Sequence, residues 1–316
     1  MNVRQKYRGK IVLCLCLLAV ASACAAQSPG ASPGTGGAPA APVQAGGLAE
    51  TVPQVNGFNF TLDSTSQHSS VTGWSNVWTP ELSFRFNSHF SVAAGIPWFL
   101  SDKAFVPVTV KGVTTTPLQQ ANSVIGDLTA AGTYELVNGD FGYNAVVTVG
   151  FATGNSLYGL SANTTTYNIT NHFEYSIGPF TPDIELGVGN SSNLVNQDIK
   201  KAYTAVGSLA NFQAGTWIDL PWKLGLDLEA YEALPIGNQN IYGTVTKKTK
   251  GKTTKTTVLE STGVAEDNGF TTELEVPIVP HLVLSGEYDL SLRQHDDIAS
   301  ISITYVFRAA KKGAGN

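Results

Sequence analysis

Acidic side chains at alternate positions are the feature of this chain that most suggests chemistry. Three pairs of carboxylates, each two residues apart, fall within its last third: Asp227 and Glu229, Glu273 and Glu275, and Glu287 and Asp289. Residues two apart on a β-strand point to the same face, and adjacent strands lie about 4.8 Å apart. Three such pairs on three successive strands predict one acidic wall, which would attract cations.

Motifs that carry catalysis or bind metal ions are missing from the sequence. The five histidines form no His-x-x-x-His pattern, and there is neither a Gly-x-Ser-x-Gly motif nor a Gly-Lys-Ser/Thr phosphate loop with the required spacing. The cysteines, Cys14, Cys16 and Cys24, all lie in the N-terminal segment, so the remainder offers no thiol chemistry. His68 and Ser70 resemble part of a hydrolase site, but no third member accompanies them. We therefore predict no enzyme, no cofactor and no metal site.

The elements that carry these side chains are predicted to be β-strands. From Val52 to Phe307, apolar residues alternate with polar ones at period two, and no segment shows helical periodicity. The alternating rows predict about twelve strands, which begin near Phe58, Leu82, Phe90, Leu128, Phe141, Tyr167, Ile184, Tyr203, Leu224, Phe270, Leu282 and Ile301. Many of them approach the roughly 9–11 residues that a tilted membrane strand needs. The apolar rows carry no charge, and the carboxylates fall on the opposite parity.

Connections of alternating length join these strands. Five are short, at 87–89, 138–140, 178–179, 220–221 and 279–280, and five are long, at 63–72, 101–123, 154–164, 190–201 and 236–268. The last connection on the long-loop side, 293–297, is the exception and is brief. Short turns on one side and long loops on the other are typical of outer-membrane β-barrels. A soluble β-sandwich also alternates apolar and polar residues, but it gives no reason for this sorting. Aromatic residues near both ends of the strands predict a girdle at each membrane interface.

Two of the long loops have patterns of their own. The basic, Thr-rich segment 247–255 is expected to form a solvated loop, or to be attracted to anionic lipopolysaccharide. The apolar row of Val106, Val108 and Val110 is interrupted by Pro107, and it either extends its hairpin or folds inward as a constriction. Because proline cannot donate to a ladder, an edge or irregular position is expected there.

Residues 1–51 differ in composition from the rest of the chain. A basic start, the apolar run 11–20 and the small residues that follow predict a secretory signal peptide over 1–26, with an N-terminal anchor as the alternative. Cleavage of the lipoprotein type would instead leave Cys24 lipidated. Residues 27–51, rich in Pro, Gly and Ala, predict a disordered linker. Loss of the four basic residues of the signal changes the net charge from 19 − 24 = −5 to 15 − 24 = −9, which argues against nucleic acid as a partner.

Several short motifs resemble one known family. The run 125–129, Ile-Gly-Asp-Leu-Thr, followed by Tyr-Glu-Leu at 134–136, is similar to the Gly-Asp-Leu strand of outer-membrane transporter barrels related to meta-pathway phenol-degradation proteins. The next strand ends with Phe-Ala-Thr-Gly at 151–154, where the family more often has Pro-Thr-Gly. Strand 300–307 resembles the aromatic-terminated signal that barrel-assembly machinery recognises, although 308–316 follow it. The resemblance implies passive uptake of small, often hydrophobic or aromatic compounds, and it supplies no catalytic residues.

The sequence therefore predicts an all-β protein, a closed antiparallel transmembrane β-barrel of about 12 strands over 52–307 with a C-terminal tail over 308–316. Export through the signal peptide would take it to the outer membrane of a Gram-negative bacterium. The expected acidic residues lining the lumen are Asp127, Glu174, Asp183, Glu185, Asp227, Glu229, Glu273, Glu275, Glu287 and Asp289. The basic candidates for the lumen are Arg85 and Lys223.

The expected function is that of a passive channel or facilitator for small hydrophobic, neutral or cationic solutes, since rings of Asp and Glu favour cations in a pore. A wet lumen also tolerates polar residues without selecting for them. The alternatives are a structural or adhesive surface barrel with a plugged lumen and, least favoured, a lipid hydrolase that uses His68. The expected partners are outer-membrane lipid and lipopolysaccharide, the barrel-assembly machinery and a small solute. Neither that solute nor the oligomeric state follows from the sequence.

Overall fold

The structure is a computed structural model, and it describes residues 56–70, 72–105, 108–110, 113–115, 117–155, 158, 160–161, 165–190, 208–237, 241–249, 252–260, 266–279, 281–293 and 297–308. These residues belong to one compact unit within Gly36–Asn316. The predicted signal peptide and linker lie outside the described residues, as does all of the predicted tail except Arg308.

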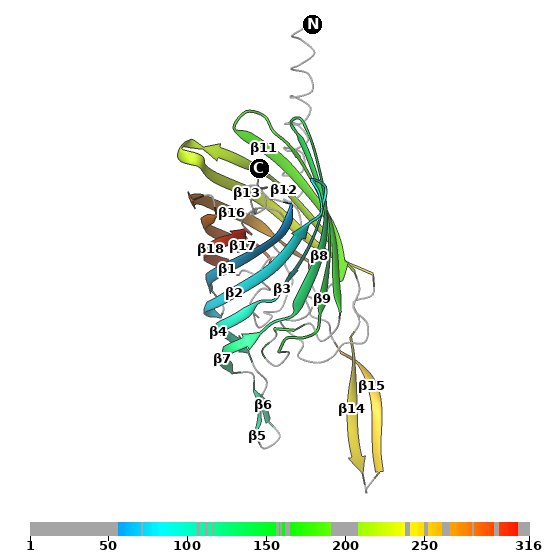
Figure 1. Cartoon of the computed structure of the whole chain (residues 1–316). Coiled ribbons are helices and arrows are strands. Elements are labelled where there is room, and N and C mark those ends of the chain that lie inside the picture. Colours follow the sequence, from blue (N-terminus) through cyan, green and yellow to red (C-terminus); the bar gives the residue numbers. More distant parts are fainter. Residues whose placement is uncertain are drawn as a thin grey trace. The chain divides into compact units, whose positions relative to one another are not determined.

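Strands make up nearly all of the described chain (Figure 1). The first half holds β1 Gly57–Ser69, β2 Gly73–Arg85, β3 Phe90–Gly95, β4 Trp98–Phe105, β5 Val108–Val110, β6 Val113–Thr115, β7 Leu118–Ile125, β8 Leu128–Asn138 and β9 Phe141–Phe151. The second half holds β10 Thr166–Tyr175, β11 Phe180–Asn190, β12 Ser208–Leu220, β13 Leu224–Ile236, β14 Ile241–Thr249, β15 Lys252–Glu260, β16 Asp267–Val279, β17 Leu282–Ser291 and β18 Asp297–Arg308.

Fourteen of these strands form one sheet that closes on itself. The hydrogen-bonded order is β1-β18-β17-β16-β13-β12-β11-β10-β9-β8-β3-β2-β4-β7, and β1 also pairs with β2. Along the sheet, β3 and β4 together occupy one strand position, because β2 pairs with both of them. In the same way, β7 and β8 together occupy the next strand position. The wall is therefore a closed antiparallel barrel of twelve strands, which confirms the predicted fold class. Closure leaves no sheet edge with unpaired backbone groups, as a membrane-spanning sheet requires.

The two interrupted strands meet at a kink in the wall. Between β3 and β4 stands Pro97, which has no N–H to donate, and its carbonyl accepts a hydrogen bond of 2.8 Å from the N–H of Gly126. Between β7 and β8, Asp127 Oδ1 accepts the N–H of Gly154 at 2.8 Å. The predicted continuous strand from Phe90 to Trp98 is thus wrong near its C-terminal end, because β3 ends at Gly95 and proline cannot continue the ladder at 97.

The two faces of the barrel differ in composition as the alternation predicts. Large apolar side chains of one parity are exposed, and β11 illustrates this with Ile184, Leu186 and Val188 at 45%, 44% and 38% exposure. The intervening carboxylates, Asp183 and Glu185, are buried at 8% and 7% exposure. An apolar face turned outward and a polar face turned inward suit a sheet surrounded by lipid.

Aromatic side chains gather at both ends of the outward face. At the short-turn end, Phe90 contacts Tyr134 with ring centroids 5.0 Å apart, and Tyr143 contacts Phe173 at the same distance. At the other end, Trp78 and Trp98 form an edge-to-face pair at 6.1 Å. This is the two-band distribution that the sequence predicts, and it suits rings that lie at the two membrane interfaces.

The predicted short connections are confirmed, and three of the predicted long loops differ from the prediction. The turns after β2, β8, β10, β12 and β16 are short. The predicted long loop 63–72 is wrong, because β1 and β2 pair without interruption from Gly57 with Arg85 to Ser69 with Gly73. The segment 236–268 is not simply a loop, since β14 and β15 pair from Ile241 with Glu260 to Thr249 with Lys252. Likewise, β5 pairs with β6 as a two-stranded sheet in the segment 101–123.

Helices contribute little to the described residues. The turn between β12 and β13 is a short 3-10 segment, Pro221–Lys223, in which Trp222 and Lys223 both have φ of 64°. Among the described residues, no helix combines the length and the apolar character needed to cross a membrane.

Candidate lumen site

Strand register places the inward carboxylates in two neighbouring rows that run across the sheet. In the first row, Glu174 pairs with Asp183, Asp183 with Gly215, Gly215 with Glu229, Glu229 with Thr271 and Thr271 with Asp289. In the second row, Trp217 pairs with Asp227, Asp227 with Glu273 and Glu273 with Glu287. The acidic wall therefore extends over β10, β11, β13, β16 and β17, with Gly215 and Trp217 of β12 at the uncharged positions of its two rows.

The three predicted pairs are offset along this wall. Asp227, Glu273 and Glu287 share the second row, so each stands directly opposite the next. Glu275 instead pairs with Gly225 and Ser285, two residues away on the other side of that row. Where β13, β16 and β17 run side by side, Glu275 therefore adds one carboxylate in a third row, next to the second.

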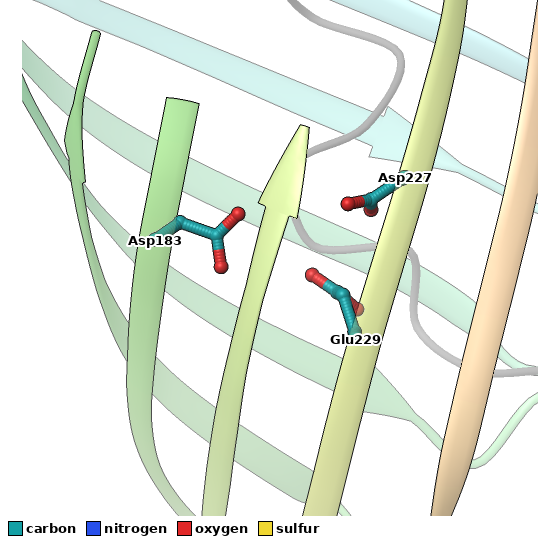
Figure 2. Close-up of side chains that lie close together, drawn as sticks. All are labelled: Asp183, Asp227 and Glu229. Carbon is teal, nitrogen blue, oxygen red and sulfur yellow. The ribbon is translucent and has the colours of Figure 1, made fainter. Parts of the chain in front are cut away.

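The densest group of carboxylates joins β11 to β13. Asp183, Asp227 and Glu229 each offer an oxygen, and these oxygens all lie within 4.8 Å of one another. Figure 2 shows the three carboxyl groups turned toward one another from two strands that flank a third. That third strand is β12, and Gly215 is its residue between Asp183 and Glu229.

A glycine at 215 makes this approach possible. A Cβ placed on Gly215 would lie 2.7 Å from Glu229 Cγ and 2.6 Å from the Leu228 carbonyl oxygen. Any larger residue at position 215 would therefore displace the Glu229 side chain, which lies across this glycine. Gln213, two residues earlier on the same face, holds Glu229 from the other side, because its Nε2 donates to Glu229 Oε2 at 2.7 Å.

A histidine stands at the β10 end of the wall. His172 pairs in register with Glu185, and its Nε2 lies 3.7 Å from Glu174 Oε2. When protonated, His172 offsets part of the negative charge of its neighbours, but Asp183, Asp227 and Glu229 together carry more charge than one imidazolium can balance.

Hydroxyl groups partner the carboxylates on β17. Ser300 Oγ donates to Glu287 Oε2 at 3.3 Å, and Tyr231 Oη donates to Asp289 Oδ1 at 3.2 Å. Nearby, Glu273 and Glu275 are buried at 7% and 0% exposure. Carboxylates this far from solvent carry a large desolvation cost unless a cation, a proton or a hydrogen bond compensates it.

The predicted basic candidates occupy different environments. Both guanidinium nitrogens of Arg85 contact the Glu135 carboxylate, with Nη1 to Oε1 at 3.3 Å, so this pair is bidentate. Lys223 lies in the exposed turn after β12 and not along a strand, where the sequence placed it. Asp127 also departs from the expected wall, since it lies between β7 and β8 and accepts the Gly154 N–H.

Residues that the sequence analysis did not select also belong to the inner face. Asp63 accepts hydrogen bonds from Thr65 and Thr304, at 2.7 and 2.9 Å, although the predicted loop 63–72 excluded it from a strand. Trp217 lies inward beside Asp227, and its Nε1 donates to Asp219 at 3.1 Å. The sequence predicts a strand that begins near Tyr203, but it carries no clear alternation of apolar and polar residues, so the inward position of Trp217 did not follow from it.

His68 and Ser70, the weak hydrolase candidates, are each engaged elsewhere. The His68 ring packs edge-on against Trp74 with centroids 5.1 Å apart. Ser70 Oγ accepts the Asp297 N–H at 3.1 Å.

A closed twelve-stranded barrel with an exposed apolar belt and a buried polar interior defines a transmembrane β-barrel of the outer-membrane type. No protein-family model matches the chain, and no curated protein matches its sequence. Among solved structures, an outer-membrane channel from Pseudomonas putida F1 is similar with a TM-score of 0.51 at 13% identity, over 83% of this chain and 100% of that chain. This likeness supports the fold.

Two further solved structures are similar at lower scores. The KdgM porin has a TM-score of 0.47 at 7% identity, over 78% of this chain and 99% of that chain. The toluene transporter TodX from Pseudomonas putida has a TM-score of 0.45 at 9% identity, over 80% of this chain and 89% of that chain.

Proposed function

We propose that this protein is a passive channel of the outer membrane that favours small cationic and neutral solutes. The observation that carries this proposal is the acidic wall, which spans adjacent strands on the inner face of a closed barrel. Carboxylates at close quarters lower the energy of a cation in a pore and raise that of an anion. The low dielectric of the surrounding wall strengthens both effects relative to bulk water.

The basic side chains identified on the inner face do little to cancel this field. Arg85 is fully engaged by Glu135, and His172 lies against Glu174. Asp227, Glu273 and Glu287 stand directly opposite one another across β13, β16 and β17, and the residues that flank them in the same row, Trp217 and Ser300, carry no charge. The net field along this side of the lumen is therefore negative.

We further propose that the solutes include hydrophobic or aromatic compounds. This part of the proposal is supported by the sequence resemblance to transporter barrels related to meta-pathway phenol-degradation proteins, which is carried by Gly126, Asp127 and Leu128. A liposome uptake assay with phenol, against glucose as a polar control, tests this part separately from ion selectivity. Equal rates for the two solutes would remove the hydrophobic class and leave the channel.

The central test is conductance across a planar bilayer with the refolded chain in a KCl gradient. We expect discrete steps and a reversal potential on the cation-selective side. The variant D227N/E273Q/E287Q removes the second row while keeping its size, so its reversal potential should move toward zero. A matched variant, Glu266→Gln, removes one exposed carboxylate that contacts Arg293, and it should behave as the wild type.

Two results would contradict the proposal. A barrel that is folded, as judged by heat-modifiable gel mobility, but electrically silent would indicate a plugged structural barrel. A conducting barrel with anion preference, or with the same reversal potential in the triple variant, would show that the acidic wall does not set selectivity.

A further inference from the structure

We propose that Asp183, Asp227 and Glu229 bind one divalent cation of the Ca²⁺ type inside the barrel. The proposal goes beyond passage of solutes, since it assigns a resident ligand to three named side chains. It does not depend on conduction, because a barrel with a closed lumen could hold the same ion.

The geometry of the donor atoms suits a single ion. Ca²⁺ binds oxygen ligands at about 2.3–2.6 Å, so two ligands of one ion lie at most about 5 Å apart. The three carboxylate oxygens all fall within 4.8 Å of one another, and they approach from two strands with the side-chain-free Gly215 between them. The absence of a side chain at Gly215 lets the Glu229 carboxylate lie across β12 and approach Asp183.

A buried oxygen without a partner points to a ligand independently of this clustering. Asp183 is only 8% exposed, and among the described residues its Oδ1 has no hydrogen-bond partner. The Asp183 carboxyl group is aimed at the other two members (Figure 2). Asp227 Oδ1 is also buried and has no partner among the described residues. Burying such oxygens without a partner is unfavourable, and a bound cation would offset that cost.

The chemistry of the donors selects the class of ion. All three are carboxylates, which are hard oxygen ligands that suit Ca²⁺, Mg²⁺ and Mn²⁺ and not the softer metals that prefer sulfur or imidazole. His172 lies on the neighbouring strand, but its ring already contacts Glu174. Ca²⁺ accepts irregular arrangements of oxygen ligands, whereas Mg²⁺ demands a near-ideal octahedron, so three carboxylates whose positions are fixed by strand register favour Ca²⁺.

The proposed site has a built-in optical reporter. Trp217 stands opposite Asp227 in the register of β12 and β13, and its ring also lies over Gly225. Tb³⁺ has the ligand preference of Ca²⁺, and its luminescence is excited by a nearby indole. We therefore expect the refolded chain in detergent to sensitise Tb³⁺ at one equivalent, and Ca²⁺ to displace it. Mg²⁺ should displace it at least tenfold less effectively.

Three test variants and one matched control variant make the experiment decisive. Asp227→Asn and Asp183→Asn should each weaken Tb³⁺ binding at least tenfold, and Trp217→Phe should abolish the signal while Ca²⁺ still raises the unfolding temperature. Glu81→Gln, which removes an inward carboxylate on β2, should bind as the wild type. If Asp183→Asn does not fold, the half-buried Asp227 still provides the test through its asparagine variant.

Three outcomes would overturn the proposal. In the first, the folded chain does not bind Tb³⁺. In the second, D227N binds Tb³⁺ as tightly as the wild type. In the third, K⁺ displaces Tb³⁺ as effectively as Ca²⁺ does at matched ionic strength. The first would mean that the three carboxyls share protons instead, and the last would mean that they attract counterions without a defined site. Because binding is measured in detergent, failure here is distinct from an electrically silent bilayer.

Discussion

At the scale of single residues, two glycines on β12 and β13 shape the inner face. Gly215 makes room for Glu229, and Gly225 makes room for the ring of Trp217, whose Cε2 would lie 2.8 Å from a Cβ added there. Both glycines follow the inward parity of their strands, where larger polar residues are the rule. Their loss would affect not the backbone but the large side chains that lie across them.

Gly225→Ala tests this role directly. The added methyl group overlaps the Trp217 ring, so the ring must move and give up its hydrogen bond to Asp219. We expect a loss of about 1–3 kcal/mol in the free energy of unfolding, as for other overpacked sites. Urea unfolding in lipid vesicles measures it, with Gly132→Ala as the control because a Cβ there has nothing within 4 Å. Equal stability of the two variants would show that Trp217 is free to move.

The pair of Arg85 and Glu135 allows a second test at this scale. Its bidentate contacts are only partly exposed, with 12% and 22% of the two side chains accessible, so the charges interact more strongly than a surface pair does. A double-mutant cycle with Arg85→Met and Glu135→Gln should give a coupling energy of about 1–2 kcal/mol in vesicle unfolding experiments. Additive effects of the two substitutions would mean that solvent screens the pair.

At the scale of elements, the period-two alternation predicts the strands and their faces but not their interruptions. The apolar rows predict β9, β10 and β17 well, because one parity must meet lipid along the whole strand. The predicted strand at β11 is too short, since β11 begins at Phe180. The extension of β1 to Ser69 was missed because Asp63, Ser64, Thr65 and Ser66 carry no apolar signal. Beyond the lipid, strands of a hairpin need only backbone pairing, so their side chains need not alternate in polarity.

The same reasoning explains which parts of the site the sequence could predict. Carboxylates at inward parity were found because charge is excluded from the opposite face. Their rows were not predictable, since register between β11, β12 and β13 depends on turn geometry over several strands. Lys223 was placed inward by parity alone, whereas the turn geometry around Trp222 removes it from the strand.

The turn itself yields a prediction for Lys223. Its φ of 64° lies in the left-handed region, which costs a non-glycine residue about 1–2 kcal/mol. Lys223→Gly should therefore stabilise the barrel by about 0.5–1 kcal/mol, after allowing for the greater freedom of glycine in the unfolded chain. Lys223→Gln keeps the strain and serves as the control in urea unfolding. A shift of the reversal potential in either variant would instead place the lysine within the ion pathway.

Strand β11 provides a test of the two faces of the wall. Ile184 stands between Asp183 and Glu185, near the middle of the strand, and its side chain is 45% exposed on the apolar side. Ile184→Lys should cost about 2–4 kcal/mol in vesicle unfolding, because a charge near the bilayer midplane is poorly solvated. The inward control Thr181→Lys should cost less than half as much. Similar costs for the two would mean that the outward face of β11 does not meet hydrocarbon.

At the scale of the whole molecule, the barrel concentrates negative charge on one side of its interior. Strands β10 to β17 carry the acidic rows, whereas on the inner face of β3, β8 and β9 the register brings together small and neutral residues such as Ala93, Ala131 and Thr148. In the proposed channel, an uneven lining of this kind would give cations a preferred track along one wall. The influence of the acidic wall on an ion should then depend on how far the electric field of the wall extends across the lumen.

Ionic strength changes this reach and so tests the electrostatic origin of selectivity. The Debye length falls from about 30 Å at 0.01 M salt to about 3 Å at 1 M, which is shorter than the width of a twelve-stranded lumen. We expect the cation preference of the wild type, measured as the reversal potential under a fixed tenfold KCl gradient, to fall steadily as the mean concentration rises.

The variant D227N/E273Q/E287Q should show a weak preference at every concentration, since it lacks the second row of charge. A preference that is large and independent of salt in both proteins would indicate that ions are selected by close contact at another constriction. A preference that falls with salt in both proteins alike would assign the field to the remaining carboxylates, of which Glu174, Asp183 and Asp289 lie in the first row.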